Sequence, residues 1–132
     1  MKARLLLDTN ILLRSVVEPR RLSKDQFRIL RDSGRRTEPF AISAMTLLEL
    51  ALLEAAGVLQ RGAAEVLSLI ETHPGILLLP LTLEICRDAA RLKPILRDPA
   101  DAVIAATARI HGIRLVTSDQ RIIGSNVVST IG

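Results

Sequence analysis

Hydrophobic residues in this chain gather into short continuous runs that alternate with longer segments of mixed character. A short apolar run followed at once by polar residues is typical of a buried strand, whereas apolar residues recurring every three or four positions indicate an amphipathic helix. Strands that alternate with helices along a chain predict a parallel sheet covered by helices on both faces. The predicted strands span residues 4–8, 39–42, 76–79, 113–117 and 126–130, and the predicted helices span residues 11–17, 23–33, 43–56, 61–71, 82–93 and 98–111.

Capping residues define the ends of two of these helices. Ser43 is a good N-cap, and Gly57 stands where a glycine commonly ends a helix. Asp98 followed by Pro99 is a strong start signal, and Gly112 ends the same helix. Because the helix that begins after Ser43 is apolar on nearly every side, we expect it to be central in the fold.

The composition favours one domain with an aliphatic core. The chain has 132 residues, of which 48% are hydrophobic, and it contains no Trp or Tyr and only two Phe. We expect a single domain over residues 1–132, with surplus apolar surface that favours an oligomer interface. Its single cysteine excludes an internal disulfide, and we expect Cys86 to be a small core residue. No apolar run reaches the roughly 18 residues of a membrane span, so we expect a cytoplasmic protein that contacts no membrane.

Four carboxylates lie within or beside the most hydrophobic segments, where an acid is costly to bury. A buried carboxylate must be hydrogen-bonded, paired with a cation or bound to a metal. Four acids in such places therefore predict an acidic, cation-binding site. They are Asp8, after the apolar run 5–7; Glu49, inside the apolar helix 43–56; Asp101, before the apolar run 102–106; and Asp119, after the strand 113–117.

The fold class indicates where these acids meet. Ligands of parallel α/β sheets bind beyond the carboxyl ends of the strands. Asp8 and Asp119 follow predicted strands, while Asp101 and Glu49 can approach the same edge from their helices. Because no His or Cys accompanies the acids, oxygen ligands favour Mg²⁺ or Mn²⁺ over zinc.

Each acid also has a purely local interpretation. Asp8 can cap the helix that follows it, and Glu49 stands three residues after Thr46, the spacing of a capping box. Asp101 can favour a helix dipole, and Asp119 can form an Asx turn. The joint pattern of the four, rather than any one of them, predicts the site.

Neighbouring polar residues form a supporting set. Asp98 either caps its helix or supports a ligating acid, and Thr9 either caps a helix or orients a water or a phosphate oxygen. Asn10 and Ser118 stand beside the first and last acids. We expect these four residues to assist the site rather than to bind a metal directly.

Positive charge is concentrated in one segment. The net charge is +4, and residues 14–36 alone hold eight basic and three acidic residues. Arginine suits phosphate oxygens because its planar guanidinium donates in pairs. The segment is either a solvated helix surface or an RNA-binding surface, and the candidate contacts are Arg14, Arg20, Arg21 and Arg28.

In their order along the chain, these segments resemble the motifs of PIN-domain ribonucleases, specifically the VapC-like toxins of type II toxin–antitoxin systems. Residues 5–10 resemble the family's first strand and first acid, and residues 43–49 resemble the segment with the second. Residues 97–108 and 115–119 resemble the segments with the third and fourth. The resemblance implies a three-layer α/β/α fold with a central, mainly parallel five-stranded sheet. It further implies a Mg²⁺- or Mn²⁺-dependent endoribonuclease, a homodimer and an antitoxin partner.

On this hypothesis, Asp8, Glu49, Asp101 and Asp119 hold the metal ion and catalyse hydrolysis of RNA. Two other classes of protein remain open. One is a catalytically silent PIN-like module that binds RNA or a partner. The other is a phosphotransfer enzyme with an aspartate nucleophile, although such phosphatases require a second acid where this chain has Asn10.

Overall fold

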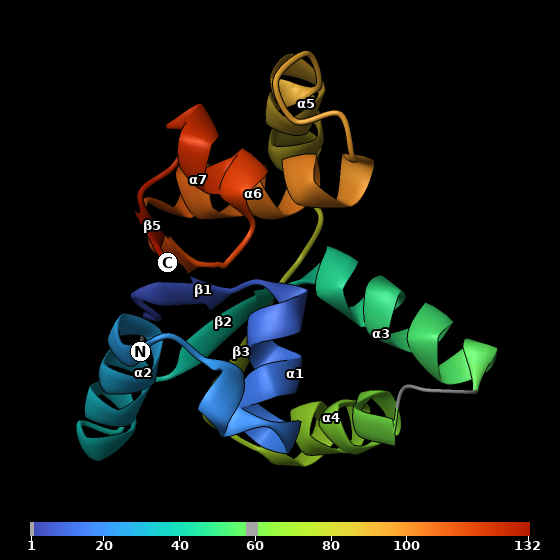
Figure 1. The fold of residues 1–132 in the computed structure, drawn as a ribbon. Coiled ribbons are helices and arrows are strands. Elements are labelled where there is room, and N and C mark those ends of the chain that lie inside the picture. Colours follow the sequence, from blue (N-terminus) through green and yellow to red (C-terminus); the bar gives the residue numbers. More distant parts are fainter. Residues whose placement is uncertain (1, 58–60) are drawn as a thin grey trace.

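The computed structural model describes residues 2–57 and 61–132, and in this part of the chain five strands form one parallel sheet (Figure 1). The strand order is β3-β2-β1-β4-β5, and every neighbouring pair is parallel. Central strand β1 pairs through Leu6 with both Ala41 and Leu115. The predicted parallel sheet is therefore confirmed. The strands are β1 (Leu5–Leu7), β2 (Phe40–Ser43), β3 (Ile76–Leu79), β4 (Arg114–Val116) and β5 (Thr130–Ile131).

Helices cover both faces of the sheet, which confirms the three-layer α/β/α architecture (Figure 1). Alternate residues of a strand point to opposite faces, so β1 contributes Leu6 to one hydrophobic core and Leu5 and Leu7 to the other. One face carries α5 (Leu83–Leu92), α6 (Pro99–His111) and α7 (Gln120–Ser125), and the other carries α1 (Thr9–Val17), α2 (Lys24–Arg35) and α4 (Arg61–Thr72).

The predicted capping residues occupy their expected positions. The Ser43 side chain accepts from the Met45 N–H at 3.0 Å and starts α3 (Ala44–Ala56), which ends at Gly57 in the left-handed conformation. Asp98 accepts from the Ala100 N–H at 2.9 Å at the start of α6. The ends of these helices were therefore readable from short-range chemistry alone.

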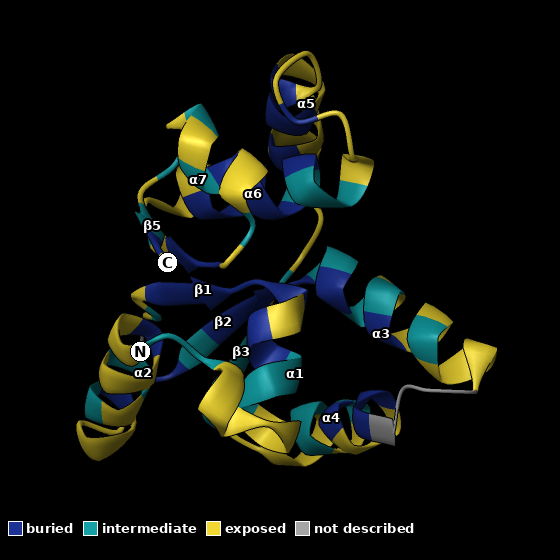
Figure 2. Cartoon of the chain, viewed as in Figure 1, coloured by how far each residue is buried: buried dark blue, intermediate teal, exposed yellow. Residues whose placement is uncertain are grey.

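The expectation that α3 is central is wrong. Only Thr46 and Leu50 are buried in this helix, and the Leu48 and Leu52 side chains are 53% and 61% exposed. Figure 2 shows α3 extending away from the sheet, with exposed residues increasing toward its C-terminal end. A helix that is apolar on all sides gives no information on which side is covered, so its pattern could not reveal this position.

Other departures are local. Cys86 is exposed rather than in the core, because Ile85 and Ala89 occupy the buried stripe of α5. Helix α2 continues through Gly34 to Arg35, and the last strand covers only 130–131. Helix α7 was not predicted, since its six residues are too few to show a periodic pattern. None of the helices in the described ranges is long and apolar enough to cross a bilayer.

Candidate active site

All four predicted acids line one pocket of about 390 Å³ at the carboxyl ends of β1 and β4. Asp8 follows β1, Asp119 follows β4 by three residues, and Asp101 and Glu49 project from α6 and α3. Thr9, Asn10, Leu52 and Leu53 complete the lining. The structure therefore brings together acids separated by more than a hundred residues of sequence, at the edge where parallel sheets bind ligands.

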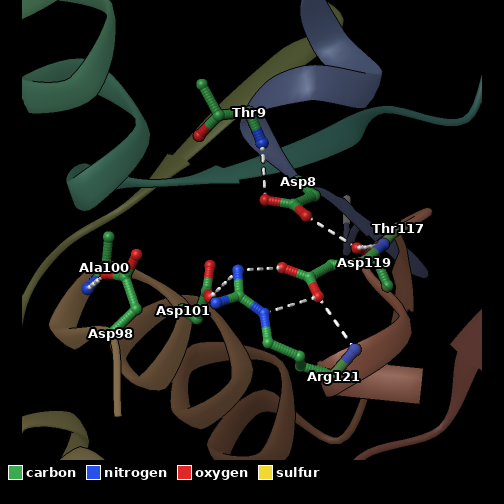
Figure 3. Close-up of polar contacts among 8 residues, drawn as sticks. All are labelled: Asp8, Thr9, Asp98, Ala100, Asp101, Thr117, Asp119 and Arg121. Atoms are coloured by element: carbon green, nitrogen blue, oxygen red, sulfur yellow. Dashed lines mark hydrogen bonds and ion pairs between the residues drawn. The ribbon is translucent and has the colours of Figure 1, made fainter. Parts of the chain in front are cut away.

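Asp8 is the most deeply enclosed of the four acids. Its Oδ1 accepts from the Thr9 N–H at 2.9 Å, and its Oδ2 accepts from the Thr117 hydroxyl at 2.6 Å (Figure 3). Burial raises the pKa of this carboxyl, and the two donors oppose the rise only in part. Asp8 is also the N-cap of α1, so it both caps the helix that follows and lines the pocket.

Glu49 is held by a hydroxyl from the first helix. The Thr9 hydroxyl donates to Glu49 Oε1 at 2.6 Å and lies 3.0 Å from the Thr46 hydroxyl. Because Ser43 is the N-cap of α3, Glu49 lies in the interior of the helix and its capping-box interpretation is wrong. Burial is the largest cause that raises the Glu49 pKa, and Asp8 and Asp98 add to it. Thr9 thus positions an acid rather than capping a helix through its side chain.

Asp101 has the most perturbed carboxyl group. It lies in the first turn of α6, three residues after the N-cap Asp98. Burial, followed by the negative charges of Asp98, Asp119 and Asp8, raises its pKa from 3.8 to about 7. A carboxyl group with this pKa is ready to exchange its proton for another cation near neutral pH.

Asp119 and Arg121 form the outer side of the pocket. Figure 3 shows the Arg121 guanidinium between Asp119 and Asp101, with Nη2 at 3.1 Å from Asp119 Oδ2 and 3.5 Å from Asp101 Oδ2. Burial alone would raise the pKa of Asp119, but the hydrogen bonds from Arg121 outweigh it and lower the pKa. The Arg121 side chain is 73% exposed, so it can leave this position at small cost. Asp119 also caps α7 by accepting from the Arg121 N–H.

The four acids provide the oxygen ligands that a hard divalent cation prefers, but their carboxylates do not converge on one metal position in this structure. Carboxylate oxygens suit Mg²⁺ and Mn²⁺. Burial first, and neighbouring acids second, raise the pKa values of Asp8, Glu49 and Asp101, and a bound cation would stabilise their charged forms. Within residues 2–57 and 61–132, no three acidic, His or Cys side chains converge closely enough to chelate one ion. Bridging water or displacement of Arg121 would fit the donors to a cation.

The remaining predicted site residues are divided between the pocket and the surface. Asn10 lines the pocket, and Asp98 caps α6 beside it. Ser118 accepts from Arg14 Nη1 at 3.3 Å, which places Arg14 next to the loop between β4 and α7. The other predicted RNA contacts lie farther along the chain on exposed surface: Arg20, Arg21 in an ion pair with Glu18, and Arg28 in an ion pair with Asp25.

Three residues that the sequence did not point to support the site. Thr117 donates to Asp8 and accepts from the Asp119 N–H at 3.1 Å. Gln26, fully buried, donates to the Thr117 carbonyl and the Ser118 hydroxyl. Arg121 pairs with two acids. The position of Thr117 just before Ser118 and Asp119 was a readable signal, whereas the 91-residue separation between Gln26 and Thr117 left none.

Solved structures share this fold. The chain resembles VapBC from Salmonella typhimurium in a DNA-bound crystal structure, with 20% identity, 98% of each chain covered and a TM-score of 0.72. It resembles VapBC2 from Rickettsia felis, bound to a promoter DNA fragment, at 16% identity, 96% coverage of each chain and a TM-score of 0.72. FitAcB from Neisseria gonorrhoeae matches at 25% identity over 97% of this chain and 96% of that one, with a TM-score of 0.67.

No curated protein matches the sequence. The sequence profile of the PIN domain, however, matches residues 5–124, which include all four acids and every strand except β5. The match agrees with the resemblance read from the ordered motifs. The chain therefore belongs to the PIN-domain family.

Proposed function

We propose that this chain is a Mg²⁺- or Mn²⁺-dependent endoribonuclease that hydrolyses RNA phosphodiester bonds. The observation that carries the proposal is the meeting of Asp8, Glu49, Asp101 and Asp119 in one pocket at the carboxyl edge of the sheet. Burial and mutual repulsion raise the pKa of three of these acids, which is the electrostatic condition for taking up a cation.

In this proposal the four acids hold the metal ion, directly or through water. A bound divalent ion would lower the pKa of a water molecule and stabilise negative charge on the phosphate. The chain's own contribution is positional. Thr117 and the Thr9 N–H fix Asp8, and the Thr9 hydroxyl fixes Glu49, so these acids need little rearrangement. Arg14, held beside Ser118, is a cation for the RNA backbone next to the pocket.

We further propose that the protein is the toxin of a toxin–antitoxin pair and acts as a homodimer. Support comes from the solved structures with the same fold, two of which are VapBC proteins in DNA-bound complexes. The exposed Leu48 and Leu52 on α3 provide apolar surface of the kind that a second protein chain covers.

Cleavage of a structured RNA with Mg²⁺ or Mn²⁺ tests the proposal. Asp8→Asn and Asp101→Asn should each lower the cleavage rate by about 100-fold or more, since each removes a charged ligand oxygen. Glu71→Gln is the control, because Glu71 is an exposed acid on α4 that does not belong to the acidic pocket. Equal cleavage by wild type, Asp8→Asn and Asp101→Asn would end the proposal.

One observation favours a second candidate, a catalytically silent module that binds RNA or a partner. Arg121 already pairs with Asp101 and Asp119, and the described acids do not converge on one point. Metal binding without cleavage of any RNA would support this alternative. A phosphotransfer enzyme is disfavoured, because both carboxylate oxygens of Asp8 accept hydrogen bonds and the group is buried.

A further inference from the structure

A second hollow, of about 710 Å³, lies at the opposite end of the sheet. Residues just before β1 and at the start of β4 line it, together with the C-terminal ends of α2 and α6. Four of its lining residues are permanently basic. We call this hollow the basic cleft and define it by Lys2, Arg4, Arg36 and Arg114, with Glu38 as its acid.

The basic cleft keeps an excess of positive charge. Among the ion pairs of residues 2–57 and 61–132, Arg36 is the only one of the four cations with an acidic partner, at 3.4 Å from Glu38. The two helix C-termini contribute roughly half a negative charge each, which is too little to neutralise the other three. Arg4 and Arg114 both line the cleft, and their backbones are adjacent, since the Arg114 N–H donates to the Arg4 carbonyl at 3.3 Å. Three cations that line one hollow without an acidic partner among the described residues favour a bound anion.

The lining of the cleft indicates the chemistry of that anion. Beyond its charged residues and His111 it offers only Ala3, Gly112 and Ile113. Its apolar side chains are those of Ala3 and Ile113, and no Phe, Trp or Tyr among the described residues lines it to anchor a peptide. Guanidinium groups, in contrast, bind phosphate oxygens in pairs, and a polynucleotide presents such oxygens at every step. Because His111 is the single ring among the described residues that line the cleft, we expect little base stacking there and only a weak dependence of binding on sequence.

We infer that the basic cleft binds the phosphate backbone of RNA at a second site, separate from the acidic pocket. The choice of RNA as the polynucleotide rests on the proposed ribonuclease function. Arg4 and Asp8 precede and follow β1, so the two sites lie about 13 Å apart along one strand, at opposite ends of it. An RNA chain that reaches both sites is held at two points while its phosphodiester bonds are cut at one.

Binding of a fluorescein-labelled, unstructured RNA oligonucleotide, measured by anisotropy in EDTA, tests the inference without any cleavage. The double variant Arg4→Gln/Arg114→Gln should bind at least about 10-fold more weakly at 0.1 M salt. The slope of log affinity against log salt should fall by about 1.4, which is 0.7 for each lost phosphate contact. Arg87→Gln/Lys93→Gln is the matched control, since Arg87 in the middle of α5 and Lys93 at its C-cap are both exposed and carry the same charge. It should change affinity less than about 2-fold.

Three outcomes would overturn the inference. Equal losses in the two double variants would show that only net charge matters. Displacement of the RNA by poly-glutamate as readily as by unlabelled RNA would assign the cleft to an acidic protein segment. Tripolyphosphate should displace RNA from the control variant at lower concentrations than from the cleft variant. Displacement at equal concentrations would show that the cleft does not recognise phosphate.

Two further measurements keep the test interpretable. Lys2→Gln alters an exposed residue outside the sheet and should weaken binding about 3-fold even if the double variant folds poorly. RNA cleavage by the wild type and by the cleft variant is the second measurement. If the protein cleaves no RNA but binds it through the cleft, the proposed nuclease function is refuted and the cleft inference stands. If the protein cleaves RNA and the cleft variant binds RNA as wild type does, the cleft inference is refuted and the nuclease function stands.

Discussion

The two ends of the sheet carry opposite charges and differ in how those charges are held. At the carboxyl end, Asp8 is buried and Glu49 is half-buried. Both accept hydrogen bonds from threonine hydroxyls and have raised pKa values. At the amino end, Arg4 and Arg114 are exposed and have no acidic partner in the described part of the chain. A buried charge interacts strongly with each neighbouring group, whereas an exposed charge is screened by water and salt. Changes at the acidic end should therefore alter stability and pH dependence, and changes at the basic end should alter binding.

The largest expected effect is stabilisation of the acidic end by a divalent ion. Saturation with Mg²⁺ or Mn²⁺ at about 100 times the Kd should add about 2.7 kcal/mol to the free energy of unfolding. Addition of EDTA should reverse the gain. Thermal unfolding with and without metal measures it, and Asp101→Asn should lose most of the shift. A wild-type melting temperature that ignores both metals would remove the basis for a cation site.

Loss of the donor to Asp8 should come next. Thr117→Val deletes the hydroxyl that donates to Asp8 Oδ2 and accepts from the Asp119 N–H, so the free energy of unfolding should fall by about 1–3 kcal/mol. The matched control is Thr107→Val, whose equally buried hydroxyl donates only to the Val103 carbonyl of its own helix. Urea unfolding of both variants at pH 7 without metal should show the larger loss for Thr117. Equal losses would mean that Asp8 does not depend on this hydroxyl.

The pH dependence of stability should follow Asp101. Its pKa of about 7 in the folded protein exceeds its ordinary 3.8, so the folded chain holds the proton more tightly. The resulting stability is fully present below about pH 4 and is lost as the pH rises through 7. After allowance for screening, the change is on the order of 1 kcal/mol. Asp101→Asn, which resembles the protonated acid, should lose this part of the pH profile in metal-free unfolding experiments. An identical profile in wild type and variant would contradict the raised pKa.

The smallest effect is expected from the exposed cation of the acidic pocket. Arg121→Gln removes the positive charge beside Asp101 and Asp119, so a divalent ion should bind about 3- to 10-fold more tightly in calorimetry. Arg114→Gln removes a charge of the same kind at the basic end and should leave metal affinity unchanged. Weaker metal binding by Arg121→Gln would show that Arg121 assists the cation rather than competing with it.

The parts of this structure that sequence could predict are those set by neighbours along the chain. Caps at Ser43 and Asp98, and the placement of Asp8 after a buried strand, depend on a few adjacent residues. The ordered acids predicted a common pocket because parallel strands end at one edge. Their roles as metal ligands stay a prediction.

The parts that sequence could not predict depend on contacts across the fold. Arg121 lies two residues from Asp119, but its contact with Asp101 exists only because α6 and α7 meet. The exposure of α3 depends on which of its sides the rest of the chain covers. Because the helix is apolar on nearly every side, its pattern does not predict which side is buried. Likewise, the sequence left open whether the arginines of residues 14–36 contact RNA or solvent. Among the described residues, a hydrogen bond to Ser118 places one of the four candidates, Arg14, beside the acidic pocket.

Thr9 holds the first two acids, Asp8 and Glu49, in a fixed relative position through hydrogen bonds to both. Its backbone N–H binds Asp8 and its hydroxyl binds Glu49, so one residue ties two acids that stand 41 positions apart in the chain. The separation of these carboxylates is consequently fixed when the first turn of α1 forms against α3, before any ligand arrives. A shift of α3 relative to the sheet would lengthen the hydrogen bond between the Thr9 hydroxyl and Glu49. This hydrogen bond therefore indicates whether the acidic pocket is correctly assembled.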